Sequence, residues 1–267
     1  MKTVYTCFPG GKFKCLTMSY DDGKLADRRL VALFNRTGIR GTFHLNSGLT
    51  RTDDNRIKPE EFRALYAGHE VSCHTLTHPT IARCPMPSVV SQVLEDRREL
   101  ERIMGYPVRG LSYPNGSYSA DICDMLRHTG IRYARVVGSS EDFAMPEDFM
   151  RWKATCHHKH RLLELGEAFL ALQKPQYQYL MYVWGHSYEF DLDDSWPLIE
   201  TFCERMGGRD DIWYATNIEI VDYMDVFSRL QFAADNSFVY NPSAASAWIR
   251  VDNGEPIEIP GGTQVTL

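Results

Sequence analysis

Two adjacent carboxylates and a spaced pair of histidines are the groups of this chain most suited to chemistry. Asp21 and Asp22 end an apolar run, His74 ends a strand-like segment, and His78 lies four residues further on. Two carboxylates buried together without partners cost several kcal/mol, and a divalent cation removes that cost by binding one and lowering the pKa of both. One carboxylate and two imidazoles suit zinc or another first-row metal. We therefore predict a cation held by His74, His78 and one of the two aspartates, with the other carboxylate beside it.

Other polar groups follow apolar segments in the same way. Ser112 to Gly116 follows a short run, and His186 ends the buried segment that begins at Tyr179. In a barrel of alternating strands and helices, reactive groups gather where the strands end. Four segments that are distant in sequence would then present polar groups to one mouth.

The elements that must hold these groups alternate between helix and strand. Helical spacing of apolar residues predicts helices over 25–35, 59–65, 88–105, 120–128, 162–172, 198–206 and 218–232. Short apolar runs predict strands over 41–45, 70–74, 133–137, 179–184 and 212–216. Several of the predicted helices stop at a glycine, the residue that best adopts the left-handed backbone of a C-cap. This alternation predicts an α/β fold with a parallel sheet and about seven or eight strand–helix units, closed or nearly closed as a barrel.

The last thirty residues have a different pattern. Short strands are expected over 238–240, 247–251, 256–259 and 264–267, separated by Asn-Pro, Asn-Gly and Gly-Gly turns. We predict two units, a barrel over 1–234 and a small antiparallel β appendage over 235–267 that packs on it.

Composition excludes several other classes of protein. The chain has 267 residues, a net charge of −6 and scattered basic residues, so it lacks the positive surface that binds nucleic acid. No apolar run approaches the roughly 20 residues that span a bilayer, and no apolar leader precedes Asp21. The seven cysteines are dispersed without a CxxC pair. We expect a cytoplasmic protein with reduced cysteines.

These motifs resemble those of a known family. Ser19-Tyr-Asp-Asp-Gly23 resembles the T-F-D-D-G motif of the NodB-homology polysaccharide deacetylases, carbohydrate esterase family 4. His74-Thr-Leu-Thr-His78 is similar to the H-[ST]-x-x-H motif of that family. Tyr113-Pro-Asn-Gly116 resembles part of its R-x-P-Y-G motif, Val183-Trp-Gly-His186 its late L-x-H motif, and Thr42-Phe-His-Leu45 its T-F-F-L segment. The resemblance covers residues 14–232.

The resemblance implies a distorted (β/α)7 barrel and a role for each matched residue. Asp21 would be the general base that takes a proton from the attacking water, and Asp22, His74 and His78 would hold the metal. Zinc is the common metal of the family, with Co²⁺, Ni²⁺ or Mn²⁺ as alternatives. His186 would protonate the leaving amine or alcohol.

The resemblance also implies residues that contact the substrate. The backbone N–H around Asn115 would help to hold the oxyanion, and Tyr113 belongs to the same motif. Trp184 lies beside His186 in sequence and could either stack on a sugar ring or pack in the core.

Two residues that support the site in the family are absent. The arginine that usually orients the catalytic aspartate is replaced by Ser112, and Arg109 lies three residues too early. The family's Asp-Trp motif has Arg151-Trp152 as its nearest counterpart, without an acid before the tryptophan. Support for Asp21 and His186 must therefore come from elsewhere, or activity is weaker than in the family.

The histidine-rich stretch Thr155-Cys-His-His-Lys-His160 follows a further predicted strand. His157 and His158 could either line the site or lie in a turn, whereas His160 is expected in a solvated turn.

The sequence predicts a metal-dependent hydrolase that removes N- or O-acetyl groups from a carbohydrate. The expected partner is an acetylated saccharide or a small acetylated compound. Two alternatives stay open. One is a related amidohydrolase that acts on a non-sugar amide, and the other is a catalytically silent protein that binds sugar.

Overall fold

The computed structural model describes residues 2–252 and 254–267. Met1 and Asn253 fall in the predicted barrel and appendage segments and lie outside the described residues. A sheet of nine strands forms the centre, in the order β7-β6-β5-β4-β3-β2-β9-β8, with β10 paired to the first half of β2. Its strands are β2 (Lys14–Asp21), β3 (Gly41–Leu45), β4 (Glu70–Cys73), β5 (Gly110–Ser112), β6 (Tyr133–Ser139), β7 (Trp152–Ala154), β8 (Cys156–His157), β9 (Tyr179–His186) and β10 (Ile212–Tyr214).

All ladders of this sheet are parallel, which confirms the predicted α/β fold of the barrel type. The strands at the two ends of the order, β7 and β8, form no ladder with each other among the described residues. The hydroxyl of Thr155 lies between them and bonds to the backbone of β9, accepting from Tyr182 N at 3.0 Å and donating to Leu180 O at 3.2 Å. The sheet therefore curves as a barrel without a continuous backbone closure.

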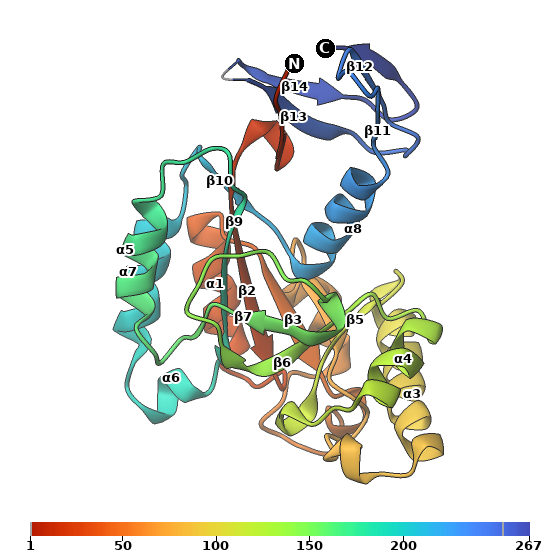
Figure 1. Ribbon diagram of the computed structural model, residues 1–267. Coiled ribbons are helices and arrows are strands. Elements are labelled where there is room, and N and C mark those ends of the chain that lie inside the picture. Colours follow the sequence, from red (N-terminus) through yellow and green to blue (C-terminus); the bar gives the residue numbers. More distant parts are fainter. Residues whose placement is uncertain (1, 253) are drawn as a thin grey trace.

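Helices cover the outside of the curved sheet (Figure 1). They are α1 (Asp27–Thr37), α2 (Phe62–Leu65), α3 (Met86–Met104), α4 (Ala120–His128), α5 (Leu162–Leu170), α6 (Glu189–Leu192), α7 (Trp196–Met206) and α8 (Asn217–Ser228). Each long helix buries an apolar stripe against the strands, as Leu30, Val31 and Phe34 of α1 do. No helix in the described ranges is long and apolar enough to cross a membrane.

The chain beyond α8 departs from the predicted helix. The helix expected to reach residue 232 ends at Ser228, and the next residues form the short strand β11 (Gln231–Phe232). In the sequence, Phe232 continues the apolar spacing of the helix. In the structure it lies in a strand instead, paired with Val239.

Two small antiparallel sheets form the end of the molecule that holds both termini (Figure 1). One has the order β1-β13-β14, with β1 (Val4–Cys7), β13 (Ala247–Val251) and β14 (Pro256–Ile259). The other has the order β11-β12-β15, with β12 (Phe238–Tyr240) and β15 (Gln264–Thr266). The N-terminal strand therefore pairs with the C-terminal segment. The division at residues 234 and 235 stays a prediction.

Candidate metal and acid–base site

The three predicted metal ligands lie together where strands β2 and β4 end. The ligand atoms of Asp22, His74 and His78 are all within 4.8 Å of one another. The Nδ1 of His74 lies 2.8 Å from the backbone oxygen of Ser112, so that nitrogen carries the proton and Nε2 is left as a lone-pair donor. Two imidazoles and one carboxylate in this arrangement fit a first-row divalent cation, zinc included.

The backbone around these ligands is held in an uncommon conformation. Asp22, Thr75 and His78 have φ angles of 80°, 63° and 61°, in the left-handed region. Each such residue costs about 1–3 kcal/mol and persists only where its surroundings determine it. Strain of this kind concentrates at functional sites, and here it falls on two of the three ligands.

Asp21 lies beside the ligands, buried at the end of β2 with 3% of its surface exposed. Its carboxylate accepts from Ser112 Oγ at 3.0 Å and pairs with the guanidinium of Arg135. His74 Nε2 is 3.8 Å from the same carboxylate. Burial works to raise the pKa of Asp21, but the charges of Arg135 and the nearby histidines outweigh it and hold that pKa well below its usual range. Asp21 is therefore ionised at neutral pH.

Arg135 takes the place of the arginine that the sequence motif lacks. It comes from β6, is completely buried, and lies with Cζ 4.3 Å above the ring of Trp184. Arg109, the other arginine near the motif, instead pairs with Asp222 at 2.6 Å on the outer surface. The sequence signal for such a partner is a charged residue in the middle of the apolar strand 133–137.

His186 faces Asp21 across neighbouring strands, because the two residues are paired in the register of β2 and β9. Its Nδ1 is 3.2 Å from Glu189 Oε2. Burial works to lower the pKa of His186, but the hydrogen bond to Glu189 and the charge of Asp21 more than offset it, so that pKa is raised. Glu189 thus supplies the acid absent before Trp152.

Glu189 also contacts three residues of the histidine-rich stretch. His157 Nε2 lies 3.2 Å, and His158 Nε2 3.4 Å, from Glu189 Oε2, while Lys159 Nζ is 2.9 Å from Oε1. His157 Nδ1 accepts from the Lys159 backbone N–H at 3.2 Å, which leaves the proton of the neutral ring on Nε2, directed at Glu189. His157, His158 and Glu189 also have the spacing of a metal-binding group, but this tautomer and the Lys159 ammonium favour an ion-paired cluster that positions His186.

The three residues predicted to contact the substrate, Trp184, Asn115 and Tyr113, lie in different surroundings. Trp184 lies under the site, 7% exposed, between Arg135 and His157. Asn115 occupies a tight turn with φ 55°, and its amide donates to Thr80 Oγ1 at 3.1 Å. Tyr113 is buried, and its hydroxyl donates to Met150 O at 2.9 Å, so its side chain points into the core.

Arg151-Trp152 is not part of the site either. Trp152 is buried in an aromatic cluster, with ring centroids 5.7 Å from Tyr133, 4.9 Å from Phe149 and 4.8 Å from Tyr182.

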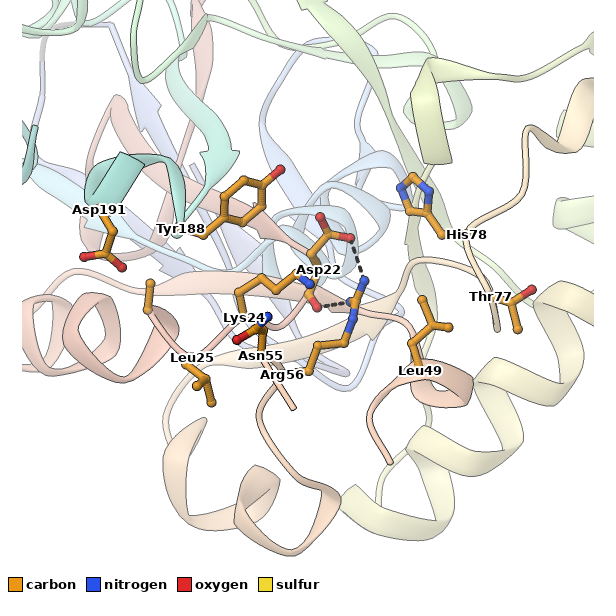
Figure 2. Close-up of a pocket in the computed structure, with 11 residues that line it drawn as sticks. Asp22, Lys24, Leu25, Leu49, Asn55, Arg56, Thr77, His78, Tyr188 and Asp191 are labelled. Carbon is orange, nitrogen blue, oxygen red and sulfur yellow. Dashed lines mark hydrogen bonds and ion pairs between the residues drawn. The ribbon is translucent and has the colours of Figure 1, made fainter. Parts of the chain in front are cut away.

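A cavity of about 790 Å³ opens beside the ligands. Asp22 and His78 form one edge, Arg56 lies below Asp22, and Tyr188 and Asp191 stand on the far side (Figure 2). The ring of Tyr188 is 5.3 Å from that of His186. Two of the three predicted metal ligands, Asp22 and His78, therefore line a cavity large enough for a small organic substrate.

The model of a protein family described as Polysaccharide deacetylase matches residues 9–134, which contain Asp21, Asp22 and the two histidines of the predicted metal site. A chitooligosaccharide deacetylase of Sinorhizobium fredii is 32% identical over 148 residues, which are 54% of this chain. The match spans 61% of the length of that relative.

Solved structures share the fold at low identity. A Mycobacterium smegmatis protein provisionally described as a polysaccharide deacetylase matches with a TM-score of 0.64 and 15% identity, over 85% of this chain and 96% of that one. A Bacillus anthracis pseudoenzyme of carbohydrate esterase family 4 matches with a TM-score of 0.51 and 16% identity, over 82% of this chain and 68% of that one.

These findings confirm the resemblance of this chain to the NodB-homology polysaccharide deacetylases, carbohydrate esterase family 4. Because a pseudoenzyme shares the fold, activity must be argued from the residues of the site.

Proposed function

We propose that the chain is a metal-dependent hydrolase that removes acetyl groups from a carbohydrate. One observation carries the proposal. A set of three metal-ligating side chains lies beside an ionised Asp21 and a hydrogen-bonded His186, and each of those two is held by a charged partner. A protein that only binds sugar needs neither a base nor an acid.

Asp22, His74 and His78 would hold the cation. When bound, a divalent cation of this type acts as a Lewis acid that lowers the pKa of water and stabilises negative charge on oxygen. Zinc is the expected metal because nitrogen and oxygen ligands in this ratio are common in zinc sites.

Asp21 would accept the proton of the attacking water. Arg135 and the Ser112 hydroxyl fix the carboxylate and keep it ionised, so that its acceptor oxygen stands ready before the substrate arrives. Positioned bases of this kind contribute roughly 10²–10⁴-fold to a rate.

His186 would give a proton to the leaving nitrogen or oxygen. Glu189 binds Nδ1, which leaves Nε2 as the atom available to the substrate, and the raised pKa keeps the imidazole protonated over a wider pH range. The base and the acid lie at the ends of neighbouring strands, which suits attack and departure on one acyl carbon.

The cavity supports a short substrate. A volume of about 790 Å³ beside Asp22 and His78 accommodates a few sugar rings, and its wall carries both polar groups and the ring of Tyr188. The chitooligosaccharide deacetylase that resembles this chain acts, by its name, on such short sugars. We therefore favour an acetylated oligosaccharide as the substrate.

A product screen tests this function. Metal-replete protein would be incubated with N-acetylated chitooligosaccharides, with O-acetylated sugars and with a cyclic ureide, and acetate and ammonia would be measured. We expect acetate from a sugar substrate and none from the D21N variant. Ammonia from the ureide without acetate from any sugar would favour the amidohydrolase alternative, and sugar binding without product would favour a silent protein.

A further inference from the structure

A buried arginine contacts the first metal ligand from below. Arg56 comes from the loop between β3 and β4 and has 5% of its surface exposed. Its Nη1 donates to the backbone oxygen of Asp22, and its Nη2 lies 3.6 Å from the Asp22 carboxylate (Figure 2). The Nε of the same guanidinium is 3.0 Å from Asp53. The planar fork is thus used in three directions, which a lysine cannot reproduce.

Asn46 extends this contact to the second ligand segment. Its Oδ1 accepts from Arg56 Nη1 at 3.0 Å. Its Nδ2 donates to the backbone oxygens of His74 and Thr75, at 2.5 and 2.9 Å. One chain of hydrogen bonds therefore joins the end of β2, which carries Asp22, to the end of β4, which carries His74.

This chain of bonds reaches the strained part of the site. Asp22 and Thr75 have left-handed backbones, and Arg56 binds the carbonyl group of Asp22 while Asn46 binds that of Thr75 as well as that of His74. Left-handed non-glycine residues persist where neighbouring contacts determine them. The contacts that Arg56 and Asn46 make are of that kind.

We propose that Arg56, acting through Asn46, is a positioning residue that pre-forms the cation site. The inference rests on the proposed metal site and assigns to Arg56 no contact with the reacting atoms. The guanidinium holds the Asp22 backbone and orients the Asn46 amide, and that amide fixes the His74–Thr75 peptides. The Asp22 and His74 ligand atoms are thereby set at their spacing before a cation arrives.

Arg56 has two effects on cation binding, and they are opposite in sign. As a positive charge 3.6 Å from the Asp22 carboxylate, it repels a cation. As a positioning group, it lowers the cost of assembling the ligands. Loss of the arginine would tighten cation binding if the charge dominated and weaken it if positioning dominated. Because the partners are backbone groups in a strained conformation, positioning is the larger effect.

The experiment measures zinc affinity by competition with a chromogenic chelator, in the absence of substrate. The variants are R56Q, which loses the charge and most donors, and R56K, which keeps the charge but not the fork. The control is R51Q, because Arg51 lies in the same loop, is exposed, and pairs with Glu60 at 2.9 Å away from the site. Thermal unfolding without metal establishes that each variant folds.

We expect zinc binding to weaken by roughly 10–100-fold in both R56Q and R56K, as happens when groups that orient metal ligands are lost. R51Q should bind zinc as the wild type does. A folded R56Q that binds zinc within twofold of the wild type, or more tightly, would overturn the inference. If R56Q does not fold, wild-type affinity in R56K overturns it in the same way. A wild-type chain that binds no zinc contradicts the proposed function itself.

Discussion

Substitution of Arg135 by methionine removes the guanidinium that faces Asp21 at the end of β2. Methionine is close to arginine in volume but ends about where the guanidinium begins, so the change removes the charge, the donors and the contact of Cζ with the Trp184 ring while most of the volume stays filled. The carboxylate would then lie buried with Ser112 and histidines as its remaining partners. Burial, which works to raise the pKa of Asp21, would no longer be opposed by the arginine.

The magnitude follows from the burial of both partners. Arg135 is fully buried and Asp21 is 3% exposed. Removal of one member of a buried ion pair costs about 3–5 kcal/mol because it leaves an unpaired buried charge. Misplacement of a catalytic group by about 1 Å costs roughly 10²-fold in rate. We therefore expect R135M to lose about 3–5 kcal/mol of unfolding free energy and roughly 10²-fold in kcat/KM.

The assay combines urea unfolding with acetate release at a metal concentration that saturates each variant. R109M is the matched control, because Arg109 lies beside the sequence motif but pairs with the half-exposed Asp222 on the surface. Exposed pairs contribute about 0.2–1 kcal/mol, so R109M should be close to the wild type in both measurements. The double variant R135M/D21N should regain part of the stability, since it leaves no unpaired charge.

A different pattern would refute this reasoning. If R109M lost activity while R135M kept it, the motif arginine would be Arg109 and the pair with Asp21 would be incidental. If D21N changed the stability of R135M and of the wild type by the same amount, Arg135 and Asp21 would not be coupled.

Three further predictions concern Glu189, His78 and Glu70. In E189Q the hydrogen-bonding carboxylate is lost, so the raised pKa of His186 should fall and the alkaline limb of the kcat–pH profile should move to lower pH; an unmoved limb would exclude Glu189 as the partner of the acid. H78A should lose zinc affinity and activity together, measured by chelator competition and acetate release, and retention of either one would remove His78 from the ligand set. Glu70 is buried, which raises its pKa from 4.5 to about 7, so its contribution to stability is full below pH 4.5 and is lost as the pH rises through about 7. In E70Q the free energy of unfolding in urea should fall less between pH 4.5 and about 7 than in the wild type. An unchanged pH dependence would contradict the raised pKa of Glu70.

The ends of the strands were predictable because they depend on local patterns. Apolar runs that stop at Asp21, His74 and His186 mark the points where parallel strands leave the barrel, and the structure brings these residues to one end of the sheet. His74 and His78 also lie within one short segment. Such groupings need only the direction of the strands and the length of a loop.

The supporting charges were not predictable in the same way. Arg135 reaches Asp21 from β6, and the two are 114 residues apart in sequence. A buried arginine in an apolar strand was a signal that some partner exists, but its identity depends on how the barrel curves. Glu189 was nearer, three residues after His186, at the start of α6 and after a turn whose direction the sequence pattern did not reveal.

The direction of the Tyr113 side chain could not be predicted from the motif either. Tyr113 belongs to the motif, but its side chain points into the core, where its hydroxyl donates to Met150 O. The predicted extension of the last helix to residue 232 was wrong because Phe232 pairs with Val239 in a strand, although its position in the sequence fits the apolar spacing of the helix.

Acetate release titrated against zinc tests the central claim most directly. The chain would first be stripped of metal with a chelator, and zinc would then be returned in steps while acetate from an N-acetylated chitooligosaccharide is measured. The account predicts no release from the stripped protein, an increase up to one zinc per chain, and no increase at any zinc level in H78A. Full release from the stripped protein, or none from the zinc-loaded wild type with any acetylated sugar, would contradict it.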